Sequence, residues 1–465
     1  MRSTTNAPAG VAAHHKDTAE VGLEILRDGG TAADAAVAAT LASCVAETTM
    51  TGLAGGGHAV HYDAATATVE CLDFFVAVPG LDSDFHPGEP LVVDMLFEDE
   101  AVPYVIGPGS VGVPGVPAGC GALAQRFGRL PWARLVEPAL RLARSGTELP
   151  PTHARVLEML APALTLAEGA DIYAPGGRLL ESNQMLHQPG LVTALELLQA
   201  EGAASFYSGS IADSLLTLMA ERGSAMSAAD LLAYTVESPH PQEVWFAGAT
   251  VYGRRDLAGA LDSLDALPNL AGADDATRAV ALARALDGRQ GRGDTTNVTV
   301  VDKAGNACVV TTSLGLGSSD WLPGLDIHLN SMLGEQDLIS GPLLPGRRLG
   351  SMMCPVVALD SGGLVCAAGA AGGSRIRSAL VQVLSGVLAE GLAVPAAVER
   401  PRLHPAGRLV HVEPDYPEPG VEALHDAGYI PRVWRTRHHF FGGVGMVGRS
   451  GAYGEPRRDG AAGVV

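Results

Sequence analysis

Basic and aromatic residues are both scarce in this chain of 465 residues. Lys and Arg number 31 against 51 Asp and Glu, and aromatics make up 5%. The resulting formal charge of -20 repels phosphate, which argues against nucleic acid or an anionic membrane as a partner. No stretch reaches the ~18 uninterrupted apolar residues of a membrane helix, and the first ten residues are polar. We therefore expect a cytoplasmic protein with neither nucleic-acid nor membrane partners.

Cysteine is also sparse, and no Cys-x-x-Cys pair occurs. Wide spacing in apolar surroundings predicts buried free thiols and excludes both a zinc site and a disulfide framework. The histidine pairs at 14–15 and 438–439 are adjacent in sequence and cannot share one helical face as paired metal ligands do. We expect no metal and no cofactor. The six cysteines are Cys44, Cys71, Cys120, Cys308, Cys354 and Cys366.

Two common catalytic signatures are missing. There is no Gly-x-Ser-x-Gly elbow, so the sequence lacks the motif that carries the nucleophile of an α/β-hydrolase triad. There is no Gly-x-x-x-x-Gly-Lys-Ser/Thr loop, nor a Gly-x-Gly-x-x-Gly run after a strand with an acidic residue downstream. A nucleotide-binding module that uses the glycines at 369–373 stays an alternative, and it predicts nucleotide-dependent thermal stabilisation.

The residues that are abundant predict an α+β protein with many tight turns, since 47% of the chain is apolar and it holds 58 glycines and 30 prolines. Hydrophobic periodicity and capping residues predict helices mainly before residue 295, and β-branched runs predict strands mainly after it. This order favours strands and helices in stacked layers over a doubly wound sheet. The predicted helices are 20–27, 31–45, 130–145, 191–201, one from Ser227, and 377–392; the main strands are 58–62, 68–75, 298–301, 307–312, 356–359 and 364–368, followed by short strands to the end.

The run Gly-Asp-Thr-Thr-Asn-Val-Thr-Val-Val-Asp at 293–302 leads from a loop into a strand. If the bond before Thr295 were cut, that residue would carry both a nucleophilic hydroxyl and an amine base. The charged, glycine-containing segment 287–293 would be accessible to such processing. On these residues alone, the simpler interpretation, a threonine that favours a strand, is the preferred one.

Two later segments favour close approach of backbone to a ligand. They are 348–355 (RLGSMMCP) and 369–375 (GAAGGSR), the second followed at once by a predicted helix. Glycines leave amide N–H groups unobstructed, and a helix N-terminus favours an anion. Such amides could hold a tetrahedral oxyanion, although both segments are also compatible with ordinary turns.

With these segments in order, the chain resembles the γ-glutamyltranspeptidase family of N-terminal-nucleophile hydrolases nearly end to end. Residues 24–38 resemble the signature LxxGGNAxDAAVA, 52–57 resemble SGIGGGG, and the run from Thr295 resembles TTHxSVVDxxGNAV. Further matches follow in the family's order at 113–115 (VPG), 206–209 (FYSG), 230–234 (DLLAY) and 455–460 (EPRRDG).

The resemblance implies a four-layer αββα sandwich and a precursor that cuts itself between Asp294 and Thr295. The products would be a helix-rich large subunit, 1–294, and a small subunit, 295–465, that carries the catalytic N-terminal threonine and remains the partner of the large one. Ser313 falls where the family has a second threonine that orients the nucleophile. Gly372 and Gly373 match the glycine pair that supplies oxyanion amides.

The substrate-binding positions are less well preserved. Ser351, with Met352, matches the end of the family's SSM run, but Gly350 replaces its first serine. Asn330 and Glu335 fall in the segment resembling LNNxMDDF, in which Glu335 would keep an acidic ligand and Met332 replaces a polar ligand of the substrate amine.

The replacements at the substrate carboxylate are more severe. Phe75 stands where the family's DFRExAP segment has its arginine, and Gly315 stands where an asparagine usually contacts the same carboxylate. Loss of such an arginine removes about 1.5–3 kcal/mol of charged hydrogen bonding.

The sequence therefore predicts a self-cleaving acyl hydrolase or transferase that acts on an amide-type bond of a small molecule, and not on a standard glutathione-type γ-glutamyl donor. Two alternatives stay open. One is hydrolysis of an acyl C–C bond in a secondary-metabolite pathway such as alkylproline antibiotic biosynthesis, and the other is a catalytically inactive binding homologue.

Overall fold

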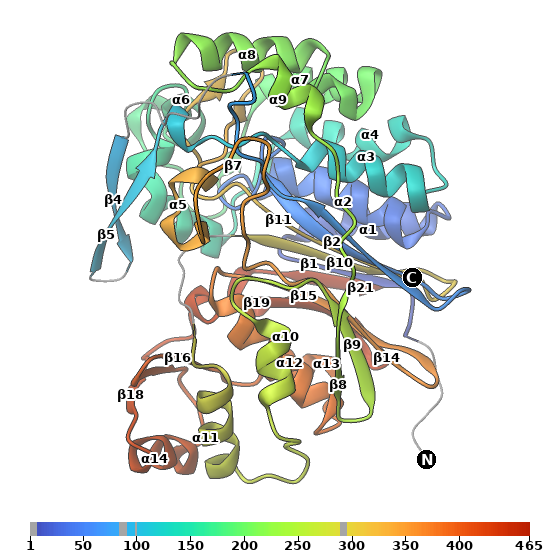
Figure 1. Cartoon of the computed structure of the whole chain (residues 1–465), viewed down its shortest axis with the longest axis vertical. Coiled ribbons are helices and arrows are strands. Elements are labelled where there is room, and N and C mark those ends of the chain that lie inside the picture. Colours follow the sequence, from blue (N-terminus) through green and yellow to red (C-terminus); the bar gives the residue numbers. More distant parts are fainter. Residues whose placement is uncertain (1–6, 83–90, 98–99, 289–294) are drawn as a thin grey trace.

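The computed structural model describes residues 7–82, 91–97, 100–288 and 295–465, and two six-stranded sheets form its centre (Figure 1). Every pairing within the two sheets is antiparallel. The first sheet has the order β21 (Ala461–Val464), β1 (Gly10–Ala13), β10 (Thr296–Val301), β11 (Ala307–Ser313), β2 (Gly56–Asp63) and β3 (Thr68–Phe74). The second has the order β20 (Gly451–Tyr453), β19 (Gly443–Gly448), β15 (Gly363–Ala371), β14 (Val356–Asp360), β9 (Ala249–Gly253) and β8 (Gln242–Phe246).

The two sheets pack against each other through β10 and β11 on one side and β15 and β19 on the other. All residues of β10 and β11 are buried, which is typical of strands covered on both faces. Between the sheets lies a cluster of mostly small or β-branched side chains, among them Ala12, Val60, Val301, Val309, Val357, Ala367 and Val447.

Helices cover the outer face of each sheet (Figure 1). On the first sheet, α1 (Lys16–Arg27) lies against β1 and β21, and α2 (Ala32–Ala46) lies against β10 and β11. Every residue of α2 is buried, and its alanines allow close approach to the sheet. Thr31 and Asp34 form a capping box at its start, which explains where the helix begins.

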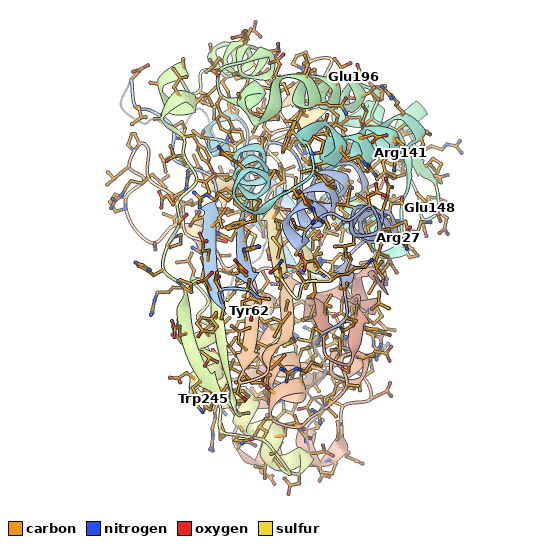
Figure 2. All side chains as sticks on the ribbon, turned by 90° about the vertical axis from the view of Figure 1, so that its right-hand side faces the viewer. Arg27, Tyr62, Arg141, Glu148, Glu196 and Trp245 are labelled. Carbon is orange, nitrogen blue, oxygen red and sulfur yellow. The ribbon has the colours of Figure 1, made fainter. Side chains whose placement is uncertain are left out.

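Further helices complete that side of the molecule, including the predicted ones. They are α3 (Val116–Phe127), α4 (Trp132–Ser145), α5 (Pro151–Leu164), α6 (Gly169–Tyr173), α7 (Pro189–Glu201), α8 (Ser210–Glu221) and α9 (Ala228–Ala233). Ser227 and Asp230 form the capping box expected at the start of α9. Charged side chains on the outer surface of these helices include Arg141 and Glu196, and Trp245 of β8 is exposed in the other half of the molecule, at the lower left in Figure 2.

On the second sheet, α12 (Arg375–Leu388) packs against β15 and β19, and α10 (Ala260–Ala266) packs against β8. Beyond them lie α11 (Asp275–Ala285), α13 (Val394–Glu399), α14 (Glu418–Asp426) and a small sheet of β16 (Leu403–Ala406), β17 (Leu409–Val412) and β18 (Ile430–Val433). Three two-stranded sheets complete the fold: β4 (Leu91–Phe97) with β5 (Glu100–Ile106), β6 (Thr147–Glu148) with β7 (Met185–Leu186), and β12 (Trp321–Leu322) with β13 (Ile327–His328).

The mixed α and β composition and most of the predicted elements are confirmed, with two local differences. The segment after residue 392 was expected to contain only short strands, but it also holds α13 and α14. The loop predicted at 369–375 is partly strand, because β15 continues to Ala371 by pairing with Gly443–Gly445 of β19. All six cysteines are buried free thiols, as predicted.

Candidate active site

Thr295 lies immediately before β10 and is nearly buried. The next residue, Thr296, pairs with Thr312 of β11, which brings Thr295 close to the end of β11, where Ser313 lies. The Ser313 hydroxyl accepts a hydrogen bond from the Gly315 amide at 3.1 Å. The predicted scissile bond involves Asp294, which lies outside the described residues.

Thr295 and Ser313 line one cavity that is partly open to solvent. The cavity gathers residues from the end of β11, from the start of α12 and from the segments that lead into or out of strands of the two sheets, and these residues are far apart in the sequence. Its other lining residues are Phe75, Met332, Glu335, Asp337, Leu338, Ser351, Met352, Met353, Gly373 and Ile376. Most of the predicted site residues therefore meet at one place.

The glycine pair forms the sharp connection from β15 to α12. Gly372 has φ +120° and Gly373 has φ +57°, backbone conformations that side chains disfavour. Gly373 lines the cavity, whereas Gly372 packs towards the segment before β19, where a Cβ would lie 3.1 Å from Cα of Gly442. The pair thus places backbone beside Thr295 at the N-terminal end of a helix, where amide groups favour negative charge.

Asn330 was predicted to bind substrate, but it is not among the residues that line the cavity. It is fully buried, and its side-chain amide donates to the carbonyl oxygens of Ala54 and Gly112 at 2.9 and 2.8 Å. Its oxygen accepts from the Gly112 amide at 3.0 Å. In this structure Asn330 ties two glycine-containing loops to the wall of the site.

Phe75 follows β3 and presents its buried ring to the cavity. The ring stacks on His58 with centroids 5.4 Å apart, and its backbone carbonyl accepts from the Tyr234 hydroxyl at 2.7 Å. Burial, with the charge of Arg254, lowers the pKa of His58 to about 3, so this imidazole is neutral at pH 7. The wall formed by Phe75 is therefore uncharged.

Two arginines lie behind this wall. Arg254 and Arg348 approach the Asp73 carboxylate at 3.6 and 3.8 Å, and Arg254 also donates to the carbonyl oxygen of Ser351 at 3.2 Å. Burial opposes ionisation of Asp73, but the positive charges near it hold its pKa below the ordinary value. Both arginines are thus engaged away from the cavity, and neither lines it.

Among the described lining residues, the only charged side chains are the carboxylates of Glu335 and Asp337; the rest of the wall is mostly apolar. Sequence analysis identified Glu335 but missed Asp337. It also missed Leu338, Met353 and Ile376, although each lies within three residues of a predicted position. Met353 does lie in the segment 348–355 that the sequence singled out, whereas spacing from predicted positions was the one available signal for Asp337, Leu338 and Ile376.

Two of the family's polar positions are filled by neighbouring side chains. At Gly350, a Cβ would lie 2.7 Å from Cδ1 of Leu257, so the leucine occupies the space beside it. At Gly315, which has φ +70°, a Cβ would lie 2.6 Å from Oε1 of Glu335 and 2.7 Å from Oγ of Ser331. The two glycines therefore lie beside the cavity wall, where Leu257, Glu335 and Ser331 leave no room for a larger side chain.

No group of three or more His, Cys, Asp or Glu side chains able to hold a metal ion occurs in the part of the chain that the structure describes. Among the same residues, no helix has both the length and the apolar character needed to cross a bilayer.

Comparison with known proteins identifies the family to which this chain belongs. The sequence profile of the family described as gamma-glutamyltranspeptidase matches residues 18–284 and 261–465. Acylase ACY 1 proenzyme from Pseudomonas sp. (strain V22) is 29% identical over 93% of this chain and 89% of that protein. Glutathione hydrolase 5 proenzyme from Rattus norvegicus is 27% identical over 90% of this chain and 86% of that protein.

Solved structures show the same fold. Cephalosporin acylase from Bacillus halodurans superposes with a TM-score of 0.83 at 22% identity, covering 100% of this chain and 97% of the other. The structure of LmbA2991HD gives a TM-score of 0.81 at 21% identity, with full coverage of both chains. The chain belongs to the γ-glutamyltranspeptidase family and is an enzyme of its N-terminal-nucleophile hydrolase type.

Proposed function

We propose that this protein is a self-cleaving acyl hydrolase or acyltransferase whose nucleophile is the hydroxyl of Thr295. The single observation that carries the proposal is the cavity in which Thr295, Ser313 and Gly373 meet. We assign its two facing sheets and outer helices to the four-layer αββα fold of N-terminal-nucleophile hydrolases.

The first step is self-cleavage between Asp294 and Thr295. The Thr295 hydroxyl adds to the Asp294 carbonyl carbon, its proton passes to the departing amide nitrogen, and an ester replaces the peptide bond. Water then hydrolyses this ester, releasing the Asp294 carboxylate and regenerating the hydroxyl. Thr295 is now the first residue of a second chain, and its free α-amine can act as a base.

In turnover, the α-amine takes the proton of the Thr295 hydroxyl as its oxygen attacks the acyl carbon of the substrate. The negative charge on the former carbonyl oxygen is held by backbone N–H groups at Gly372 and Gly373. The leaving amine departs with the proton, and water or a second amine then takes the acyl group from the threonine ester. The hydroxyl of Ser313 orients the nucleophile.

A denaturing gel tests the nucleophile directly. We expect the wild-type chain to divide into fragments 1–294 and 295–465, while Thr295→Ala stays intact, and N-terminal sequencing of the smaller fragment should begin at Thr295. Thr295→Ser is the matched control, because it retains a hydroxyl and should still cleave. A wild-type chain that stays intact after long incubation would contradict the proposal.

The acyl group that the cavity accepts is not a standard γ-glutamyl group. Phe75 replaces a carboxylate-binding cation, the nearby arginines are engaged by Asp73 and backbone, and Glu335 and Asp337 would repel an anion. An uncharged or cationic acyl group of modest size fits this wall better.

Release of p-nitroaniline tests this specificity. We expect γ-glutamyl-p-nitroanilide to be a poor substrate. A p-nitroanilide whose acyl group has an apolar chain and an amine but no carboxylate should be turned over at least about tenfold faster, since a charged contact contributes roughly 1.5–3 kcal/mol. Thr295→Ala should abolish both activities. A low-millimolar or better KM with efficient turnover of the γ-glutamyl compound would refute the assignment.

A second candidate function is hydrolysis of a C–C bond next to a carbonyl, which the same nucleophilic attack and oxyanion site would support. The apolar wall, which has no cation, favours an acyl group without a carboxylate in this reaction too. Mass analysis of products separates the two reactions, because C–C hydrolysis releases a carbon acid where amide hydrolysis releases an amine.

A further inference from the structure

A fully buried carboxylate lies beneath the residue that follows the proposed nucleophile. Glu47 is the C-terminal cap residue of α2. Its Oε1 accepts a hydrogen bond from the Thr18 hydroxyl of α1 at 2.7 Å, and its Oε2 accepts one from the Thr296 hydroxyl at the start of β10. One carboxylate therefore connects two helices to the strand that carries the site.

The backbone holds this carboxylate in place. The carbonyl oxygen of Glu47 accepts from the amides of Met50 and Thr51 at 2.8 and 3.0 Å. The Thr51 hydroxyl in turn donates to that of Thr312 at 2.9 Å, and Thr312 is the cross-strand partner of Thr296. The turn at 47–51 thus contacts both strands at the point where they reach the cavity.

Strand geometry connects this contact to the nucleophile. Successive side chains of a strand point to opposite faces, so Thr296 points to the helix layer while its neighbours on either side point to the other sheet. Asn297 shows that second direction, because its Oδ1 lies where a Cβ on Gly369 of β15 would be. Thr295 lies on that same side and lines the cavity.

We propose that Glu47 is a positioning residue that sets the direction of Thr295 by holding Thr296, an inference that rests on the proposed function. Chain ends fray unless they are anchored, and self-cleavage makes Thr295 a chain end. A hydrogen bond to a carboxylate is about twice as strong as one between neutral groups, so Glu47 is suited to hold the residue next to that end.

Packing alone gives no reason for a charged residue here. Burying a carboxylate is unfavourable unless it is well paired, and an apolar side chain usually serves stability equally well at such a position. The carboxylate accepts a hydrogen bond from the Thr296 hydroxyl of β10, which an apolar side chain could not do. Misplacement of a nucleophile by about 1 Å can cost about a hundredfold in rate.

The test measures the self-cleavage rate of the full chain on denaturing gels, which requires no knowledge of the substrate, together with the melting temperature. Thr296→Val should slow cleavage by about tenfold or more, and Thr296→Ser, which restores the hydroxyl, should return it to within about threefold of wild type. Thr18→Val is the matched control, because it removes the other hydroxyl on the same carboxylate. It should lower the melting temperature as much as Thr296→Val does but slow cleavage far less.

Glu47→Gln should slow cleavage as Thr296→Val does, and the double variant should be no slower than the slower single variant, because both changes remove one interaction. If Glu47→Gln fails to fold, the two Thr296 variants still decide the question. Cleavage at the wild-type rate in Thr296→Val, or equal slowing by Thr18→Val, would overturn the inference and leave the proposed function intact. Failure of wild type and Thr295→Ser to cleave would overturn both.

Discussion

At the scale of single residues, Phe75 in the cavity wall and Gly315 and Gly350 beside it are positions at which this chain departs from the family motifs that its sequence resembles. Phe75 removes a cation, Gly350 makes space that Leu257 fills, and Gly315 makes space for Glu335. By that resemblance, each replacement removes a polar group from the position where we expect the substrate to bind. Restoring one of these groups alone should therefore meet the side chain that has taken its place.

Gly350→Ser tests this repacking. The new Cβ would lie 2.7 Å from Cδ1 and 3.0 Å from Cγ of Leu257, so we expect a loss of about 1–3 kcal/mol in the free energy of unfolding. Combining it with Leu257→Ala should cost less than the sum of the two single changes, because the clash is relieved. Denaturant titration of the four proteins measures the coupling, and strict additivity would show that the two sites are independent.

At the scale of elements, the two sheets are joined by a buried polar contact as well as by apolar packing. Asn297 of β10 donates to the Thr299 hydroxyl and accepts from the Thr311 hydroxyl, each at 2.9 Å. Thr299 donates to the carbonyl oxygen of Gly445 in the second sheet at 3.0 Å. A close approach between the sheets is possible because Gly369 has no side chain.

Gly369→Ala should therefore be strongly destabilising. Its Cβ would lie 1.9 Å from Oδ1 of Asn297, which must then shift and weaken the bond from Thr311. We expect a cost of about 3 kcal/mol or more in the free energy of unfolding. Gly341→Ala is the control, because its Cβ would meet nothing within 4 Å. Equal melting temperatures for the two variants would contradict this account.

Local sequence signals were sufficient for elements that carry their own boundaries. The restart after Asp28-Gly29-Gly30 predicted the start of α2 to within one residue, the cap at Ser227 predicted the start of α9, and β-branched runs predicted β10 and β11. Local sequence signals failed where pairing with a strand distant in the sequence determines the secondary structure. Residues up to Ala371 become strand because β19, more than seventy residues later, pairs with them.

The candidate site was predictable in part for the same reason. Motifs indicated Thr295, Ser313 and the glycine pair, since such motifs preserve backbone conformations and hydroxyl positions. They could not indicate that Leu257 fills the space at Gly350, or that Glu47 reaches Thr296, because those contacts join segments with no sequence signal in common.

At the scale of the whole molecule, several buried histidines make stability depend on pH. Burial is the largest cause in each case. It lowers the pKa to about 3 or about 4 from an ordinary value of 6.5, so each of these side chains is neutral in the folded protein at pH 6. Those at about 3 are His14, His58 and His328; those at about 4 are His61, His411 and His438.

We predict that the protein loses stability as the pH falls from about 6.5 towards 4. An unfolded histidine binds a proton below its ordinary pKa, whereas these side chains in the folded state do not, so the unfolded state takes up more protons in this window. Each such group adds at most about 1.4 kcal/mol per pH unit to the slope, and about half of that at pH 6.5, where the unfolded histidine is half protonated. Denaturant titrations between pH 7 and 5 measure it.

His328→Gln provides the control for this prediction. Removing this one depressed histidine should reduce the slope by about one proton at the acidic end of the range. A slope that is the same in wild type and His328→Gln would show that this histidine does not contribute.

Both sheets draw strands from each side of position 294: β1, β2 and β3 join β10, β11 and β21, and β8 and β9 join β14, β15, β19 and β20. Cutting the chain there would leave two polypeptides that both contribute to each of the two sheets. Neither polypeptide could form either sheet alone. Refolding, unimolecular for the uncut precursor, would become a second-order reassociation that slows on dilution. Self-cleavage would thus free the α-amine that catalysis needs and would also make refolding inefficient. The lifetime of the mature enzyme would then depend on how slowly it unfolds.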